Sequence, residues 1–372
     1  MLVEASGSDD DRLLAEVDRF ARRAIEPRTA RPEAPADEAA FGAILAEADA
    51  LGLAADASAA SGLAPWDELD RALPPARTLA VLVRLARANT SVALAVHARA
   101  LARALLRRGE VHPAPARPTL ALQGRLGLGR GALAAVLASA ELGDDDRAML
   151  ADVYAPGAAR VLPLDPSMDA LVTLAFDGRG LGFQLHDRAA LAIAVDAHPH
   201  GLDELSTATV SPRAEARLRL PVSAGDVASA IAADQLALVA VALGAVERAH
   251  GLARAFAAQR RQGGRVIDRH DAVQLLLARS RATIESVLGA LEGCAARPLS
   301  PSRFGAALGV RATSMPALAG AAHAAMQVFG GLGYMRETGV ERVARDVNAL
   351  RAMAGAPGEL ALVLAAWERL HE

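Results

Sequence analysis

Residues 327–346 of the chain read QVFGGLGYMRETGVERVARD. An alanine-rich run that is typical of a helix comes directly before them, and Gly330, Gly331 and Gly333 then fall within four positions. A helix that ends at a glycine pair leaves backbone N–H and C=O groups bare, with no Cβ to keep a ligand at a distance. Glycine alone indicates a helix C-cap. The tyrosine and the charged residues that follow make the whole string more specific than a glycine cap.

The complete string resembles the C-terminal signature of the acyl-CoA dehydrogenase family, Q-x-x-G-G-x-G-Y followed by V-E-R-x-x-R-D. The resemblance implies a mainly α-helical protein with a central β domain. It predicts an N-terminal helical domain over residues 1–113, a small β domain over 114–222 and a C-terminal four-helix bundle over 223–372. It also implies the α,β-dehydrogenation of an acyl-CoA thioester with FAD, in a homo- or hetero-oligomer with another chain of the family.

Composition excludes several other classes of function. All 40 basic residues are arginines, and the net charge is −3, which gives no electrostatic reason to bind nucleic acid or an anionic membrane. The single cysteine, Cys294, forbids an internal disulfide, and the acidic N-terminus does not resemble a signal peptide, so we expect a cytoplasmic protein. The longest apolar run, residues 236–246, is too short to span a bilayer and predicts a buried helix.

The remaining periodicity fits a helical, then β, then helical layout. Helices are expected over residues 13–25, 41–51, 78–87, 90–108, 227–261, 271–291, 302–312 and 316–329, and strands over 161–164, 170–176, 181–185, 190–195 and 216–220. The segment 89–109 resembles the family's N-terminal helical domain. His97, which lies within it, is interpreted as a core or interface histidine.

A candidate cofactor site lies in the last third of the chain. The turn QRRQGGR at residues 259–265 resembles the family's R-x-x-F-G turn, with Gly263 in place of the phenylalanine. In the family, the arginine matched by Arg260 reaches the FAD diphosphate of a neighbouring subunit, and the residues matched by Gln327, Gly330 and Gly331 line the same cofactor. An arginine fork beside bare backbone N–H groups suits phosphate. Without the resemblance, an arginine cluster after a helix indicates a C-terminal cap.

The catalytic acid of the family is missing from its usual place. The reaction requires a carboxylate to remove the α-proton of the thioester. Where the family has E-G-T, this chain has Ala354-Gly355-Ala356. Some family members place the base on the first bundle helix instead, where Gln235 stands here with Asp234 beside it. Asp234 is therefore a candidate base; its preferred interpretation is a polar break on a solvated helix face.

The segments that hold the flavin ring also depart from the family. The T-E-P-x-x-G-S-D loop is absent. The most similar segment, residues 139–145, keeps only the acid and the glycine of that motif. The W-I-T strand aligns with residues 161–163, VLP, so its tryptophan and threonine are gone. Groups for a neighbour's FAD are retained while groups for the chain's own flavin are lost. The non-catalytic chain of a heteromeric dehydrogenase would explain this asymmetry.

Three alternatives stay open. The chain can be a stand-alone family enzyme that uses Asp234 or another acid, or a catalytically inactive ligand-binding or scaffold protein. The third is an NAD-linked enzyme, because GLGRGA at Gly127–Ala132 matches the dinucleotide fingerprint and Asp165 could mimic its ribose-binding acid. The pair His198 and His200 has no third ligand near it in the sequence, so no metal site is predicted.

Overall fold

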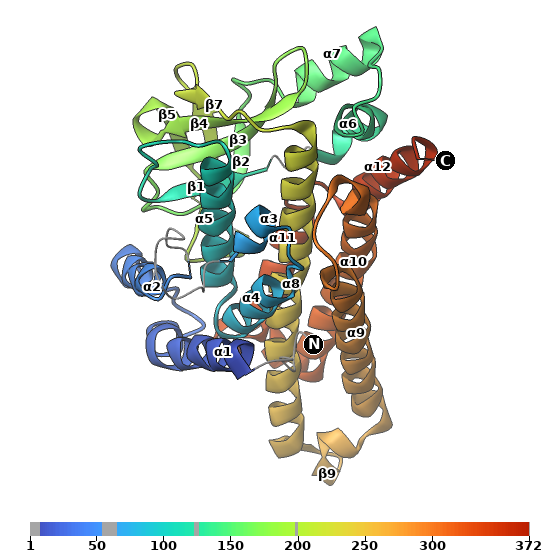
Figure 1. The fold of residues 1–372 in the computed structure, drawn as a ribbon. Coiled ribbons are helices and arrows are strands. Elements are labelled where there is room, and N and C mark those ends of the chain that lie inside the picture. The colour runs from blue at the N-terminus through green and yellow to red at the C-terminus, as the bar shows by residue number, and fades with distance from the viewer. Residues whose placement is uncertain (1–7, 54–64, 123–125, 198–199, 372) are drawn as a thin grey trace.

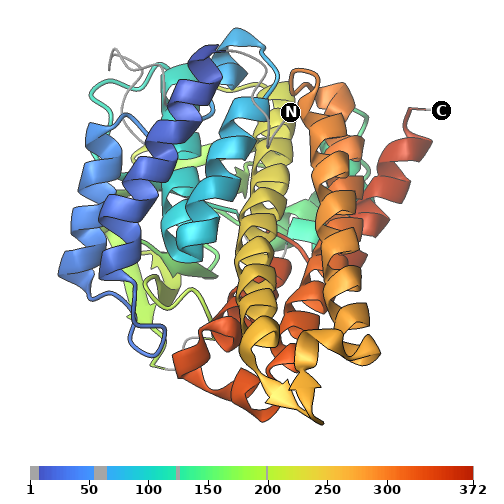
Figure 2. The same cartoon turned by 90° about the horizontal axis from the view of Figure 1, so that it is seen from below.

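A computed structural model describes residues 8–53, 65–122, 126–197 and 200–371. It is mostly helical with small β sheets, as the sequence predicts. The long helix α8 (Ala224–Gln259) runs through the middle of the molecule, with the sheets at one end and a short β hairpin at the other (Figure 1). Seen along the other direction, the N-terminal helices lie on one side of α8, and α9 and α10 lie on the opposite side (Figure 2).

The N-terminal part contains five helices in the described residues: α1 (Ser8–Phe20), α2 (Glu38–Ala50), α3 (Asp67–Arg71), α4 (Ala76–Ala88) and α5 (Thr90–Arg108). The helices expected over 78–87 and 90–108 are both present. Asn89 caps α5, because its side-chain oxygen accepts a hydrogen bond from the backbone N–H of Val92 at 3.0 Å. Helix α5 is buried along most of its length, which places its middle residues against α8 and the sheets.

Two sheets make the β part. One has the order β1-β3-β4-β7 and the other β2-β6-β5. The strands are β1 (Pro118–Ala121), β2 (Arg160–Leu164), β3 (Ala170–Phe176), β4 (Leu181–Asp187), β5 (Leu191–Val195), β6 (Ser206–Pro212) and β7 (Leu218–Arg219). Each of the five expected strands is present. The sequence missed β1, which is four residues long and begins with proline, and β6, which is rich in serine and threonine and lacks a hydrophobic alternation.

Between the strands lie two short helices, α6 (Arg130–Leu137) and α7 (Asp144–Val153). The C-terminal part is a helical bundle of α8, α9 (Asp271–Ala295), α10 (Phe304–Val328), α11 (Val340–Ala352) and α12 (Pro357–Arg369). Two stretches are long and apolar enough to cross a membrane by composition. In α8 the apolar window is 94% buried within the protein, as expected of a core helix, and the other stretch joins α11 and α12, which are separate helices.

One expectation about the bundle is wrong. Pro316 was expected to separate a helix over 302–312 from another over 316–329, but α10 continues through it without a break. An interior proline removes a hydrogen bond and costs about 3 kcal/mol. Burial on both sides offsets this cost, because Met315 and Leu318 are fully buried in the core. Packing against α8 and α9 therefore decides the length of α10.

Candidate functional site

A cavity lies where the sheets meet α5, α8 and the end of α11. It has a volume of about 580 Å³, within the usual size range of small-molecule sites. Most side chains around it are small or aliphatic, and its polar lining residues include His97 and Asp234. The strand residues Val161, Leu162 and Pro163, which align with the family's flavin-packing strand, also line it.

Asp234 is buried in the wall of this cavity. Only 8% of the residue is exposed, and its Oδ1 lies 3.0 Å from Nε2 of His97. The preferred expectation of a solvated helix face is therefore wrong. The reason is that α8 is covered on all sides at this level, and the neighbouring Gln235 and Leu236 are fully buried.

His97 is held from its other side by a tryptophan. The indole Nε1 of Trp66 lies 3.0 Å from Nδ1 of His97, and both side chains are almost completely buried. An indole nitrogen can only donate, so Nδ1 of His97 is the acceptor and the ring proton lies on Nε2, which donates to Asp234. His97 is thus a buried histidine, as expected, but one with both nitrogens engaged. No sequence pattern pointed to Trp66, which lies outside every predicted helix.

Of the two positions that the resemblance aligns with the family's base, Ala354 lines the cavity and Gln235 is fully buried behind its wall. Ala354 is also buried, and its backbone carbonyl accepts a hydrogen bond from Nε2 of Gln235 at 3.1 Å. The fully buried Arg311 supports this loop by donating to Gln235 Oε1 at 3.1 Å and to the Leu350 and Met353 carbonyls at 2.6 and 2.9 Å. Neither aligned position carries an acid, and the carboxylate beside them belongs to Asp234, the residue before Gln235.

Burial shapes the electrostatics of this wall. It lowers the pKa of Arg311 to about 10, and the charge of Asp234 acts in the opposite direction. Asp234 Oδ2 and Arg311 Nη1 are buried and have no hydrogen-bond partner among the described residues. The wall therefore holds a carboxylate that is oriented through one oxygen only.

The charged half of the C-terminal signature binds the loop that closes the cavity. Arg345 makes a two-pronged ion pair with Asp203, at 2.7 and 2.8 Å. Asp346 Oδ1 accepts the backbone N–H of Leu202 at 2.6 Å, and Arg342 pairs with Glu204. Burial raises the pKa of Asp346 to about 6, partly opposed by the charge of Arg342. These charges therefore have an internal, structural role.

The glycine half of the signature lies at the other end of the bundle. Arg260, Gln327, Gly330 and Gly331 are all exposed, at the ends of α8 and α10. Phe256 stacks on Phe329 with ring centroids 4.3 Å apart, which joins the two helix ends. Beyond Arg260 the chain forms the hairpin of β8 (Arg261–Gln262) and β9 (Arg265–Val266), visible at the tip of the molecule in Figures 1 and 2. We name Arg260, Gln327, Gly330 and Gly331 together the tip site.

The three glycines of the signature are under different structural constraints. Gly330 has φ +60°, which a helix C-cap accounts for. A Cβ at Gly333 would lie 2.3 Å from the Met326 carbonyl oxygen, so close packing requires that glycine. Gly331 has neither constraint, since a Cβ there would meet no atom of the described chain within 4 Å. Its surface is open to a molecule from outside.

The tip site and the cavity lie on one continuous helix. Asp234 and Arg260 are separated by 26 residues along α8 and its cap, which corresponds to about 39 Å at 1.5 Å per residue. A single bound dinucleotide cannot contact both places on the same chain. A cofactor held at the tip site would therefore present its far end to another molecule.

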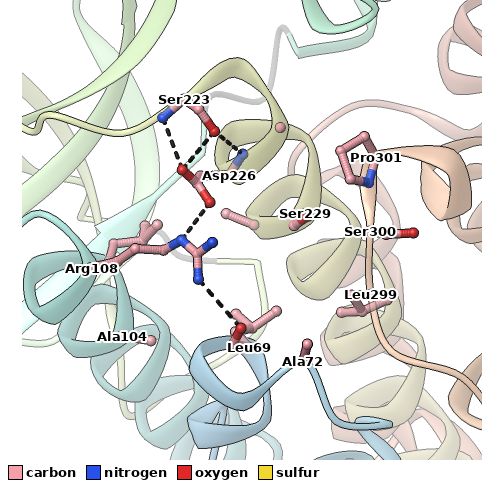
Figure 3. A pocket seen from close by; sticks show the side chains of 13 residues that line it. Leu69, Ala72, Ala104, Arg108, Ser223, Asp226, Ser229, Leu299, Ser300 and Pro301 are labelled. Carbon is pink, nitrogen blue, oxygen red and sulfur yellow. Dashed lines mark hydrogen bonds and ion pairs between the residues drawn. The ribbon is translucent and has the colours of Figure 1, made fainter.

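A second, smaller cavity of about 300 Å³ lies at the start of α8 (Figure 3). Its charged groups serve the fold: Asp226 forms a capping box with Ser223 and also binds Arg108, whose guanidinium donates to the Leu69 carbonyl at 3.4 Å. Figure 3 shows Arg108 lying between Asp226 and Leu69. Because these polar groups already bind one another, this cavity is the weaker candidate for a functional site.

Other sequence motifs have structural explanations. A Cβ at Gly127 would lie 2.4 Å from Glu359 and one at Gly129 would lie 2.7 Å from Tyr154, so protein occupies the space that a pyrophosphate would need. Asp165 binds the buried Arg99 at 2.7 Å. The described strands include one parallel pair, β1 with β3, instead of a parallel sheet, so the geometry does not support the NAD interpretation.

Two further expectations concern loops. Residues 139–145, the segment most similar to the family's flavin-binding loop, lie on the largely exposed connection between α6 and α7. They do not line the cavity. The segment that does reach the cavity follows β1, at Leu122. His198 lies outside the described residues. No group of three metal-binding side chains occurs in the part of the chain that the structure describes.

Comparisons with known proteins agree with this architecture. Residues 226–367 match the model of the acyl-CoA dehydrogenase C-terminal domain, and no curated protein matches the sequence. Butyryl-CoA dehydrogenase from Megasphaera elsdenii superposes with a TM-score of 0.74 at 14% identity, covering 99% of this chain and 100% of that one. The Tcur3481-Tcur3483 steroid acyl-CoA dehydrogenase gives 0.72 at 18% identity, covering 97% and 99%.

The fold extends to a relative with different chemistry. Nitroalkane oxidase superposes with a TM-score of 0.70 at 13% identity, over 99% of this chain and 96% of that one. Identities this low establish the architecture and leave the reaction open. Residues 226–367 thus match the C-terminal domain of acyl-CoA dehydrogenases, and the chain as a whole has the acyl-CoA dehydrogenase fold.

Proposed function

We propose that the chain is a subunit of an FAD-dependent acyl-CoA dehydrogenase and that its tip site binds the FAD diphosphate of a neighbouring chain. The separation of about 39 Å between Arg260 and the cavity supports this proposal, because two parts of a flavin site that lie so far apart on one chain would have to serve different flavins. The open surface at Gly331, which no internal packing requires, supports it further.

The residues at the tip site fit a diphosphate. Arg260 makes no side-chain hydrogen bond or ion pair that the structure records, so its five N–H donors are available for phosphate oxygens. Gly330 and Gly331 let the backbone approach closely, and the end of α10 carries Gln327 beside them. When bound, FAD supplies the hydride acceptor for the β-hydrogen of the substrate. At the tip, this chain's part is to hold and orient the cofactor.

Within such an assembly we propose that the chain is the non-catalytic partner of a hetero-oligomer. Ala354 cannot accept a proton, and Val161 and Pro163 offer no side-chain donor to a flavin ring at the cavity. The steroid dehydrogenase relative is named by a pair of gene products, which makes a two-chain enzyme a natural model. Acyl-CoA would then be processed in the cavity of the other chain.

The test measures FAD affinity by fluorescence quenching, with the chain mixed with a family member that carries intact T-E-P and E-G-T motifs. Arg260→Ala and Gly331→Leu should each weaken FAD binding at least about tenfold, or roughly 1.4 kcal/mol. Arg281→Ala, which removes an exposed arginine paired with Glu285 on α9, is the matched control and should change nothing. Unchanged affinity in both tip variants would show that the glycines are only a helix cap.

Flavin content gives a second test of the shared site. The lone chain should purify colourless or with substoichiometric FAD, and the absorbance near the flavin bands should rise when the second chain is added. A yellow, stoichiometric flavoprotein from the lone chain would contradict the proposal.

A second candidate function rests on a separate observation. Asp234 is a buried carboxylate in the cavity wall, so the chain can also act by itself with Asp234 as base. In that case the lone chain would turn over acyl-CoA, and Asp234→Asn would abolish turnover while circular dichroism stays unchanged. Turnover that survives Asp234→Asn would remove this candidate.

A further inference from the structure

The hairpin that follows Arg260, at the tip of the molecule in Figure 1, is too short to be stable by itself. Its strands β8 and β9 pair at two positions. An isolated two-stranded hairpin is marginally stable at best in water. The turn residues Gly263 and Gly264 have φ +60° and +79°, the left-handed values that a tight two-residue turn requires. The turn sets the shape of the hairpin, and its stability has to come from contacts with the rest of the chain.

His270, at the start of α9, supplies such contacts. Its Nε2 lies 3.0 Å from the carbonyl oxygen of Gln262 on β8, and its Nδ1 lies 3.3 Å from Nη2 of Arg265 on β9. A Cβ at Gly263 would lie 3.4 Å from its Cε1, so the ring lies against the turn. One half-buried imidazole therefore contacts both strands and the turn between them.

The two hydrogen bonds require the same neutral tautomer of His270. A carbonyl oxygen can only accept a hydrogen bond and a guanidinium can only donate one. The proton of the ring is therefore on Nε2, which donates to Gln262, while Nδ1 accepts from Arg265. Both ring nitrogens are used by the hairpin, and neither is left for another partner.

The side chain of His270 does not cap α9. His270 occupies the N-cap position, where the side chain usually accepts a hydrogen bond from the first turn of the helix, but it makes no such bond here. Its backbone carbonyl accepts the N–H groups of Val273 and Gln274 at 2.9 and 3.0 Å. The backbone of His270 is thus fixed by a helix of 25 residues, which makes the ring a firm support for the hairpin.

The backbone of Arg260 is fixed between α8 and this hairpin. Its N–H donates to the Phe256 carbonyl at 2.9 Å, and its own carbonyl accepts the N–H of Ile267, directly after β9, at 2.8 Å. We propose that His270 is a positioning residue of the tip site: it holds the hairpin closed and so fixes the direction in which the Arg260 side chain leaves α8. The inference rests on the proposed function for its ligand, the FAD diphosphate of a neighbouring chain.

The expected gain is one of order before binding. A segment that is already ordered does not have to be ordered by its ligand, so affinity rises without a new contact to that ligand. His270 should therefore raise the affinity of the tip site for FAD through Arg260, without touching the phosphates itself.

The first measurement uses the lone chain without FAD. Hydrogen–deuterium exchange of a peptide that spans residues 259–270, read by mass spectrometry, reports the backbone hydrogen bonds of the hairpin and of its base at Ile267. His270→Phe keeps a ring against the turn and removes both hydrogen bonds, so it should speed this exchange about tenfold or more. His270→Gln can still donate to the Gln262 carbonyl and accept from Arg265, and should stay within about threefold of the unaltered chain.

The second measurement is FAD affinity, by fluorescence quenching, of the chain mixed with a family member that carries intact T-E-P and E-G-T motifs. His270→Phe should weaken FAD binding about three- to tenfold, because the hairpin then has to be ordered on binding, and His270→Gln should restore it to within about twofold. In a chain that already carries Arg260→Ala, His270→Phe should change the affinity by less than about twofold, since its effect passes through Arg260.

A matched control is available on α10. His323→Phe removes an exposed histidine that contacts Asn348 and has no recorded contact with the hairpin. It should leave both the exchange of residues 259–270 and the FAD affinity unchanged.

The outcomes separate this inference from the shared-flavin proposal. Exchange in His270→Phe that matches the unaltered chain, or exchange that is equally fast in His270→Phe and His270→Gln, would overturn the role of His270 in holding the hairpin. If Arg260→Ala weakens FAD binding but His270→Phe does not, or if the two effects add, the shared site stands and His270 does not position Arg260. If Arg260→Ala leaves FAD affinity unchanged, the shared-flavin proposal fails, and the exchange measurement still decides whether His270 holds the hairpin.

Discussion

The two parts of α8 around Asp234 and Arg260 lie in opposite environments. Near Asp234 the helix is covered on every side, and its polar side chains form hydrogen bonds with His97, Arg311 and the Ala354 carbonyl. At Arg260 the helix ends in solvent, and the signature residues there are exposed. Buried polar groups must be satisfied from within the chain, whereas exposed ones are free to serve another molecule. A signature residue that makes no contact needed by the fold is therefore the better indication of an external ligand.

The largest change in the free energy of unfolding is expected beside the cavity. Arg311→Met removes the donors to the Leu350 and Met353 carbonyls and leaves Asp234 without its nearby positive charge. We expect the free energy of unfolding to fall by about 3 kcal/mol or more, measured by urea denaturation. Arg260→Ala at the tip should change it by less than about 0.5 kcal/mol. Similar losses in the two variants would break the contrast.

The buried Asp346 predicts a smaller effect that depends on pH. Its pKa is raised to about 6 in the folded chain, from about 3.9 in an unfolded one, so the folded state binds its proton more tightly. Its contribution to stability is therefore complete below about pH 4 and is lost as the pH rises through about 6.

Asp346→Asn tests this, because the amide oxygen can still accept the Leu202 N–H but does not titrate. From pH 4.5 to pH 7 the variant should gain about 2 kcal/mol in unfolding free energy relative to the unaltered chain. Urea titrations at the two pH values give the difference. Parallel stability profiles would mean that the carboxylate stays ionised in both states.

The smallest effect compares two glycines of one signature. Gly333→Ala should lower the unfolding free energy by about 1–3 kcal/mol, because its Cβ meets the Met326 carbonyl. Gly331→Ala has open space and should stay within about 0.5 kcal/mol. Thermal unfolding of both variants gives the comparison. Equal destabilisation would show that Gly331 also has an internal packing role.

The sequence predicted the tip better than the cavity, for a physical reason. The tip motif is local: Arg260 follows one helix, and Gly330 and Gly331 end another, so spacing and resemblance were enough to select them. Whether they bind a cofactor stays a prediction. The cavity depends on contacts between distant segments, since His97 and Asp234 are 137 positions apart and Trp66 is 31 positions before His97.

Other misses have the same origin. Asp234 next to Gln235 suggested a solvated face, because a pair of polar residues in a helix gives no sign of the buried partners that will satisfy it. Pro316 suggested a helix break, because the sequence does not show how firmly α10 packs on both sides of it. Local propensity was outweighed by tertiary packing in both places.

The ion pairs between Arg345 and Asp203, and the hydrogen bond from Leu202 to Asp346, have a consequence for how such chains are recognised. Any descendant that keeps this loop in place needs these charges to fold, whether or not it still holds a flavin. The V-E-R-x-x-R-D half of the signature is therefore a mark of architecture, and it can persist in a chain that no longer carries out the chemistry. A chain that carries this motif shares the fold. Its function has to be inferred from residues that have no such structural role.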